Sequence, residues 1–585
     1  MVAAAFYVLS FIFAVSMLIV LPKTRKKINI IVDVMFSYVT ILNIAAFVTF
    51  FINIFGITVS LVSMGVVFAC IGILFAIMML VKRKMQSHYL RKADVISVCV
   101  LVLSVGLLML YVFTPYIHAN YYNNVDPYNH FLYAKTIIRT GHLSRMFYNS
   151  LYNAMFIELF SWAMPQSWGY KAFILSDIYH IIVELLFFYA ALVLLKEKRK
   201  NGKYAELFWS LFYFSSFLLF SFLWGFVYWS MATMLAEYVF LLVKMRKESE
   251  IPQKIMWGYI GVGLFAVTMC YIQFAPIMVC AVAAVVIYDL YKEGKISFQW
   301  SYIKYAVGIA VTLMIVALVG YKYVFHDTGI DFFSALKTGE QQNIGLEVIL
   351  MLPWVMLIIL RDLRESKRLT AMQVAYLASM SVQMLFTILS ICHIVSTYYL
   401  QKNYFILLFL SIIIIIEGKS GLSKEIVRTA NVVCVGCLCF LMLSYAGSES
   451  KTFSLQQSTL VQNMDIMFEH DFSKGELSDN GKIYLMQYAM EELKTEKDVI
   501  PLIISSGVGH GNGIWFDATY DNSTYIWIED YQCTEDRMDE LLKERKATYF
   551  IVFFDDLLYI YDLHEYFDSF ERIYQNDAGF IGKVN

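Results

Sequence analysis

Charged residues and proline are both scarce in this sequence. Asp, Glu, Lys and Arg make up 16% of the 585 residues, hydrophobic residues make up 59%, and the mean hydropathy is +0.60. So little charge excludes an ordinary soluble enzyme and indicates a protein with several membrane-spanning helices. Because there are only 8 prolines, we expect most of these helices to run without a break. The formal net charge of -1 gives no electrostatic reason to expect nucleic acid as a partner.

The sequence also lacks a cysteine pattern typical of a metal site. Three of its 9 cysteines, Cys434, Cys437 and Cys439, lie close together in one apolar run. No histidine or acidic residue accompanies them in that run, so we interpret them as small buried side chains.

Long apolar runs are what the sequence has in abundance. They mark about fourteen expected membrane-spanning helices, at residues 2–21, 28–53, 57–81, 95–114, 171–195, 204–222, 225–243, 257–274, 275–290, 303–324, 346–360, 371–391, 403–416 and 429–446. The first run lacks a signal-peptide cleavage pattern, so we expect it to remain as a spanning helix. The spans divide the chain into N-terminal transmembrane helices (1–114), an outer loop (115–170), a transmembrane core (171–446) and a C-terminal region (447–585).

The distribution of positive charge predicts the orientation. The linkers 23–27, 82–92, 196–203, 244–254, 291–295, 361–368 and 417–428 together contain 27 Lys and Arg residues, whereas the loops 115–170, 325–345 and 392–402 contain 5. The positive-inside rule places the first set in the cytoplasm and the second set outside it. The C-terminal region is then also extracytoplasmic, and the plasma membrane is the expected location.

The outer loop 115–170 is predicted to form two helices that lie in the membrane interface. Asp126 before Pro127 is typical of a helix start, with Asp126 as the N-cap, and Gly141 is expected to end this helix. Phe131, Ala134 and Ile138 are expected to form its apolar face. Residues 147–164 repeat this character and form the second expected helix.

Asp126 is the first candidate for chemistry. An aspartate before a proline is also a good helix cap in any protein, so the residue pattern alone leaves a structural role open. Its setting beside Tyr122, Asn129 and His130, which are candidate substrate-binding side chains, favours a polar site at the membrane surface.

Asp177, His180 and Glu184 form a second group of candidates. Their spacing places all three on one face of the helix that follows the outer loop, at depths where ionisable groups are costly. They are candidates for an auxiliary or divalent-metal site, with a buried hydrogen-bonded network as the alternative. His326 and Asp327, in the loop 325–345, are candidate auxiliary ligands or simply solvated polar residues.

Lys402 is the only Lys or Arg in the outer segment 392–402. It lies at the head of an expected span, next to Tyr398 and Tyr399. One interpretation is an anchor whose ammonium reaches up to water. The other is a contact for a phosphate at the membrane surface, with the two tyrosines beside it.

The C-terminal region changes composition abruptly. VIPLIISS and TYFIVFF are typical of buried strands, and residues 481–493 and 535–545 are typical of helices. We therefore predict a small α/β domain. Its loop GVGHGNG, at 507–513, is interpreted as a flexible turn.

Three segments resemble the GT-C superfamily of membrane glycosyltransferases. VDPYNHFLYAKTIIRTGHL (125–143) is similar to the first outer loop of that family, where an aspartate precedes an aromatic and histidine-rich helix that ends in glycine. TYYLQKNYFILLFL (397–410) is similar to a late segment in which tyrosines and a basic residue open a helix. ATYFIVFFDD through FERIYQNDAGFIGKVN (547–585) resembles the small α/β endings of bacterial members.

The resemblance implies a function. Members transfer a sugar from a polyprenyl-phosphate carrier to an acceptor on the outer face of the membrane, usually with inversion. Asp126 then takes the role of general base, and Lys402 the role of phosphate contact. Many members have a second acid where this sequence has Pro127, which leaves the use of a divalent metal open. The expected acceptor is a glycan, lipid or protein of the cell envelope.

Two other function classes are alternatives. A transporter or flippase for a lipid-linked saccharide would be expected to show broken helices and repeated halves, which few prolines and the absence of a visible repeat disfavour. A glycan polymerase or ligase would be expected to rely on outer-loop arginines, which are scarce here.

The orientation is directly testable. A topology reporter fused after Asn585 should be active outside the cytoplasm, because the charge bias places the chain end there. Activity of the reporter in the cytoplasm would contradict the orientation and, with it, the position of the candidate site.

Overall fold

The computed structural model describes most of the chain, with gaps. The described segments are residues 2–18, 27–82, 87–119, 125–143, 170–196, 204–223, 225–247, 251–294, 346–366, 368–392, 398–418, 480–491, 501–506, 525–528, 534–544, 546–554 and 563–584, with a few single residues or pairs between them. Two of the expected spans, 303–324 and most of 429–446, lie outside the described residues, as do the expected second interfacial helix at 147–164 and the glycine-rich loop at 507–513.

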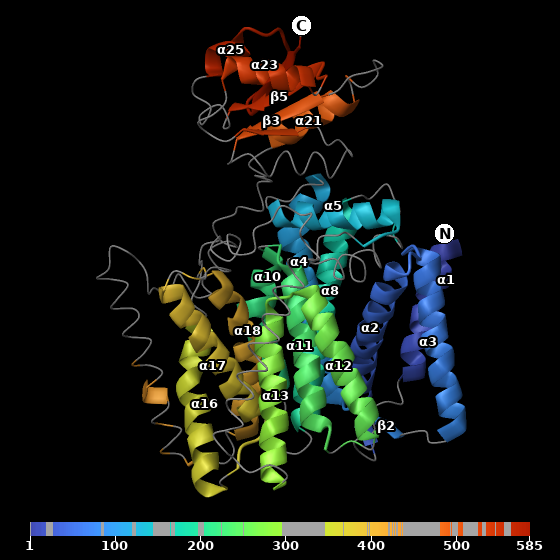
Figure 1. Cartoon of the computed structure of the whole chain (residues 1–585), viewed down its shortest axis with the longest axis vertical. Helices are drawn as coiled ribbons and strands as arrows, with labels where there is room; N and C mark the ends of the chain where they lie inside the picture. The colour runs from blue at the N-terminus through green and yellow to red at the C-terminus, as the bar shows by residue number, and fades with distance from the viewer. Residues whose placement is uncertain are drawn as a thin grey trace.

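Long helices form one bundle (Figure 1). In chain order they are α1 (Val2–Leu18), α2 (Ile30–Ile54), α3 (Leu61–Lys82), α4 (Lys92–Ala119), α8 (Tyr170–Lys196), α9 (Ala205–Tyr213), a π-helical turn η3 (Phe214–Leu218), α10 (Leu219–Leu223), α11 (Val227–Met245), α12 (Gln253–Cys270), α13 (Phe274–Lys292), α16 (Leu346–Glu365), α17 (Ala371–Ile391) and α18 (Tyr398–Gly418). Within the described residues, eight helical stretches are long and apolar enough to cross a membrane. The protein is therefore a polytopic helical membrane protein.

Helix α11 is the most enclosed of these eight stretches, since 94% of its apolar window is buried. It packs against α8, α12 and α13 and also against α2, α17 and α18. A helix that is apolar on all sides is expected at the centre of a bundle. The position of a residue on α11 therefore decides which neighbouring helix it meets.

The N-terminal helix α1 packs closely on α3 through two glycines. A Cβ atom at Gly65 would lie 2.7 Å from the ring of Phe6, and one at Gly72 would lie 2.4 Å from the ring of Phe13. Both pairs are seven residues apart, so the same contact repeats after two helical turns. Small residues at such positions let two membrane helices approach closely.

Two short strands tie helices together at the end of the bundle opposite α5 (Val125–Thr140) (Figure 1). Strands β1 (Lys27–Asn29) and β2 (Ser87–Tyr89) pair in parallel. The side-chain amide of Asn29 donates to Asp94 at 2.7 Å, and Arg91 donates two hydrogen bonds to the same carboxylate, each at 2.7 Å. The starts of α2 and α4 are therefore held together by buried polar contacts.

Helix α5 runs across the end of the bundle rather than along it (Figure 1). It ends as expected at Gly141, which has φ of +70° and whose amide donates to the carbonyl oxygen of Ile137 at 2.7 Å. The expected N-cap position of Asp126 is wrong, because α5 already begins at Val125. Asp126 is the second residue of the helix, where a carboxylate still complements the helix dipole.

The apolar face of α5 differs by one residue from the expectation. Phe131 and Ala134 are buried, but Ile138 is 40% exposed, and Ile137 is buried in its place. The end of the helix is fixed to the connection between α2 and α3, where the amide of Val59 donates to the carbonyl oxygen of Gly141 at 2.6 Å. This contact holds the end of α5 in the orientation in which Ile137 faces inward.

The C-terminal strands form one mixed sheet in the order β4-β3-β5-β7-β6. Its strands are β3 (Pro501–Ser506), β4 (Tyr525–Ile528), β5 (Tyr549–Phe553), β6 (Arg572–Asn576) and β7 (Gly579–Lys583), and the nearby helices are α21 (Asn480–Glu491), α23 (Glu535–Glu544) and α25 (His564–Asp568). Strands β3 and β5 coincide with the two strands expected from the sequence. The sheet lies beyond the same end of the bundle as α5 (Figure 1).

A matched pair of glycines tests the anchoring of α5. Gly141→Ala should lower the thermal midpoint in detergent more than Gly56→Ala. Both residues have positive φ, so each alanine costs about 1 kcal/mol in backbone strain. Only at Gly141 would the new Cβ also meet Thr58, at 2.7 Å, whereas nothing lies within 4 Å at Gly56. We expect the overpacking to add about 1–3 kcal/mol. Equal midpoints for the two variants would contradict the close contact with Thr58.

Candidate functional site

Asp126 lies in the first turn of α5, above the helix bundle. The side chains of Asp126 and Asn129 lie outside the described part of the structure, as does the whole of Tyr122. Asp126 comes one helical turn before His130, whose side chain is described. His130 therefore shows where this face of the helix meets the rest of the protein.

His130 points into the bundle and contacts the start of α11. Its side chain is buried, and the centre of its ring lies 4.6 Å from the ring centre of Tyr228. The next residue, Phe131, packs against Phe173 of α8 at 5.5 Å between ring centres. Through these two consecutive aromatic residues, α5 packs against α11 and α8.

Burial controls the charge of His130. Removal of the imidazole from water lowers the pKa of His130 to about 3. The ring is therefore neutral at ordinary pH. A neutral imidazole in this position can exchange hydrogen bonds but contributes no positive charge to the site.

Lys402 lies four residues after the start of α18 and is fully buried. Its ammonium nitrogen lies 3.3 Å from the ring centre of Phe226 and 4.0 Å from that of Trp229. Of the two interpretations of Lys402, this burial does not fit the anchor, because an anchoring lysine would have its ammonium in water. Aromatic faces attract a cation through their quadrupole, and this attraction is strongest away from water.

The backbone of Lys402 is held by the same tryptophan. The indole Nε1 of Trp229 donates a hydrogen bond to the carbonyl oxygen of Lys402 at 3.2 Å. Tyr398 and Tyr399 are the first two residues of α18, and their side chains lie outside the described part. Trp229 thus fixes both the ammonium and the main chain of Lys402.

The start of α11 therefore brings together two segments that are far apart in the sequence. His130 of α5 contacts Tyr228, and Lys402 of α18 contacts Trp229, the next residue along the chain. The sequence identified His130 and Lys402 as candidates separately. It did not identify Tyr228 and Trp229, although two adjacent aromatic residues at the head of an apolar run were a visible signal.

Asp177, His180 and Glu184 do share the interior face of α8, where all three are buried. No group of three or more His, Cys, Asp or Glu side chains suited to a metal ion occurs among the described residues, so these three do not form a metal site by themselves. The physical reason is length, since seven residues of helix separate the outer two by about 10 Å. His326 and Asp327 lie outside the described residues.

Sequence reasoning missed the partner of Glu184 in the interior. Glu237 of α11 is also buried, and it acts electrostatically on Glu184. The hydroxyl of Tyr213 donates to Glu237 Oε1 at 2.7 Å. A single acid within the apolar run 225–243 was the signal that could have found it.

Comparison with known proteins gives no match to any family model, curated protein or solved structure.

Replacement of His130 should change the response to acid. The pKa of His130 is lowered in the folded protein, whereas in the unfolded chain the same histidine has its ordinary pKa near 6.5. Below about pH 6.5 the unfolded chain therefore binds more protons than the folded protein, so the folded protein loses stability as the pH falls. This loss approaches about 1.4 kcal/mol for each pH unit between the two pKa values. His130→Phe should therefore show a smaller drop in thermal midpoint between about pH 6 and about pH 4 than the wild type.

The control for this measurement is His142→Phe. His142 is exposed just beyond the end of α5, so its replacement also removes one histidine from the same region. The drop in thermal midpoint should be reduced more by His130→Phe than by His142→Phe, because His130 is buried and His142 is exposed. Identical curves for all three proteins would contradict the burial of His130.

Proposed function

We propose that this protein transfers a sugar from a polyprenyl-phosphate donor to a glycan, lipid or protein acceptor at the outer face of the plasma membrane. The proposal is motivated by the resemblance of residues 125–143 and 397–410 to GT-C glycosyltransferases. The observation that carries it is the meeting of α5 and α18 at Tyr228 and Trp229. The resemblance assigns the base to the first helix and the phosphate contact to the second, so a transferase needs them side by side.

In this proposal Asp126 is the general base. It accepts the proton of the acceptor hydroxyl while the bond between the sugar and the phosphate breaks through an oxocarbenium-like state. Its position one turn before the buried His130 places it at the end of α5 that contacts α11. His130, Asn129 and Tyr122 are the proposed contacts for sugar or acceptor hydroxyls.

Lys402 neutralises the departing phosphate in this proposal, with Tyr398 and Tyr399 beside it. A fixed cation lowers the barrier most when charge develops on the leaving group. Because Lys402 is fully buried, the contact requires Phe226 to move aside when the donor lipid binds. The backbone of Phe226 is held by hydrogen bonds to Ser221 and Trp229, so the required movement is a rotation of the side chain alone.

The proposal includes about fourteen spans and a C-terminal α/β domain, residues 447–585, outside the cytoplasm. Two features support this orientation. The sheet and α5 lie at the same end of the bundle, whereas β1 and β2, which adjoin lysine- and arginine-rich linkers, lie at the other end (Figure 1). A carrier lipid would then reach the site from the outer half of the bilayer.

A second candidate function is the transport of a lipid-linked saccharide. The buried carboxyl groups of Glu184 and Glu237 favour it, because acids inside transmembrane helices are frequent in proton-coupled carriers. The two functions differ in their chemistry. Only a transferase releases polyprenyl phosphate.

The decisive experiment measures release of polyprenyl phosphate from a polyprenyl-phosphate sugar by the purified protein with acceptor present. Asp126→Asn should lower turnover at least about a hundredfold, because an amide cannot accept the proton. Asp536→Asn is the matched control: Asp536 is also the second residue of a helix, α23, and its side chain is exposed. It should leave turnover unchanged.

Folding and insertion of both variants are checked by their thermal midpoints. Near-normal turnover of Asp126→Asn would reduce Asp126 to a structural role at the start of α5. Absence of polyprenyl phosphate release by the wild type, together with movement of the intact lipid-linked saccharide across vesicles, would instead support the transporter.

A further inference from the structure

Two glutamates lie inside the bundle, near the middle of the helices that carry them. Glu184 of α8 and Glu237 of α11 are each 2% exposed. Both helices pack against each other, and both are long and apolar enough to cross a membrane. An ionised carboxylate at such a depth is costly, so carboxyl groups found there usually serve a function.

The two carboxyl groups have different hydrogen-bond surroundings. Glu237 accepts a hydrogen bond from the hydroxyl of Tyr213 at 2.7 Å. No group among the described residues donates a hydrogen bond to either oxygen of Glu184. The hydroxyl of Ser230 faces Glu184, but it donates its proton to the carbonyl oxygen of Val227 at 2.9 Å. Glu184 is thus a buried acid whose nearby hydroxyl, that of Ser230, is engaged with a backbone carbonyl.

The titratable groups around Glu184 do not balance a negative charge. Those that act on it from the neighbouring helices and from α8 itself are Asp177, Tyr213, Glu237 and Cys270. His180 lies one turn before it on α8 and is also buried. None of these groups is a lysine or an arginine. Phe188, one turn after Glu184, stacks on Tyr213 at 4.0 Å between ring centres, and Tyr213 donates to Glu237, so the two acids lie in the same part of the interior. Two carboxylates in a medium of low dielectric constant repel each other, which favours a proton on one of them.

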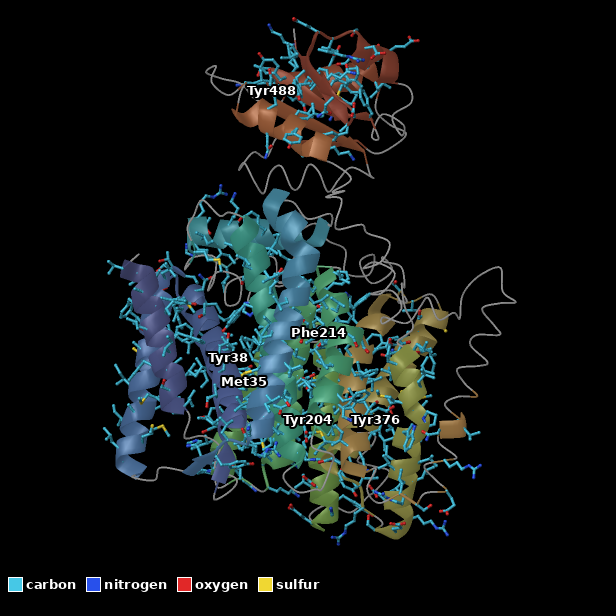
Figure 2. The ribbon with its side chains drawn as sticks, turned by 180° about the vertical axis from the view of Figure 1, so that it is seen from behind. Met35, Tyr38, Tyr204, Phe214, Tyr376 and Tyr488 are labelled. Carbon is cyan, nitrogen blue, oxygen red and sulfur yellow. The ribbon has the colours of Figure 1, made fainter. Side chains whose placement is uncertain are left out.

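The backbone beside this pair is irregular. Tyr213 ends α9 and is followed directly by the π-helical turn η3, Phe214–Leu218. Phe214, the first residue of the turn, lies well inside the bundle (Figure 2). Turns of this type occur frequently at functional sites, because they disturb the regular ladder of helical hydrogen bonds.

We propose that Glu184 and Glu237 form an intramembrane proton-binding site, in which Glu184 carries the exchangeable proton and Tyr213 fixes Glu237. When Glu184 releases its proton, the hydroxyl of Ser230 turns from the carbonyl oxygen of Val227 to the new carboxylate. The O–H bond of the Glu184 carboxyl group breaks and its proton passes to water of the surrounding solution, no covalent bond between heavy atoms changes, and one hydrogen bond changes its acceptor. The site gives the protein a proton-dependent step that does not depend on the proposed sugar transfer.

The test uses dicyclohexylcarbodiimide, an apolar reagent that modifies protonated carboxyl groups. The purified full-length protein in lipid nanodiscs is treated over a series of pH values, and modified residues are located by peptide mass spectrometry. Glu184 should be modified at mildly acidic pH, and its modification should fall by about tenfold for each pH unit once the carboxyl group ionises. Asp94, a buried acid that is paired with Arg91, is the internal control and should not be modified.

Two variants sharpen the result. Glu184→Gln should abolish the modification at this position. Glu237→Gln should keep it but shift its loss to lower pH, because removal of the neighbouring acid makes ionisation of Glu184 easier. A modification of Glu184 that does not vary with pH, or one that is unaffected by Glu237→Gln, would overturn the proposal.

Infrared difference spectra between acidic and alkaline buffer cover the case in which the reagent does not reach the site. The wild type should show the carbonyl band of a protonated carboxyl group, and Glu184→Gln should lack it. Identical spectra for the two proteins would also overturn the proposal. Neither measurement uses sugar donor or acceptor, so both would still test the proton-binding site if the transferase hypothesis failed.

Discussion

The contact between Trp229 and Lys402 determines how two distant parts of the chain are placed. The indole ring lies under the ammonium, and its N–H group donates to the backbone of the same residue. A single side chain of the central helix therefore fixes both position and rotation at the head of α18. Because the neighbouring Tyr228 meets His130, the start of α11 also receives α5. Loss of Trp229 would release the head of α18 and weaken the contact of α5 with the start of α11.

The central helix α11 resolves a general difficulty of membrane proteins. Lipid offers no hydrogen bonds, so polar groups inside the bundle must find partners within the protein. At one end of α11 the aromatic face of Trp229 receives the ammonium of Lys402 from α18, and in its middle the acid Glu237 accepts a hydrogen bond from a tyrosine hydroxyl. One helix thus contacts a basic group of a neighbour and carries an acid of its own, at different depths.

Much of this architecture followed from local patterns. The glycine at the end of α5 and the hydrophobic runs of β3 and β5 are determined by nearby residues, and the sequence located all three. The rotation of α5 was missed, since Ile137 and Ile138 fit an apolar stripe equally well. Contacts with distant segments decide between them: Gly141 accepts a hydrogen bond from Val59, and Phe131 packs on Phe173.

The candidate site was harder to predict for the same reason. The direction of the Lys402 side chain depends on Phe226 and Trp229, which belong to another helix. Local composition left two interpretations open, an anchor with its ammonium in water and a contact for a phosphate, and neither included the aromatic partners. The pairing of Glu184 with Glu237 likewise depends on how α8 and α11 pack. Such contacts between distant segments are not visible in a local pattern.

The attachment of α5 at its end has a mechanical consequence. The helix is held at Gly141, and Asp126 lies 15 residues away, a distance of about 22 Å along the axis. A rotation of about 5° at the attached end moves the other end by about 2 Å, which in the proposed reaction would misplace Asp126. The ring contact between His130 and Tyr228 opposes this rotation near the N-terminal end of α5. Alignment of the aspartate thus depends on two supports at opposite ends of one helix, and a change in the turn between α2 and α3 can be transmitted to it without touching the site.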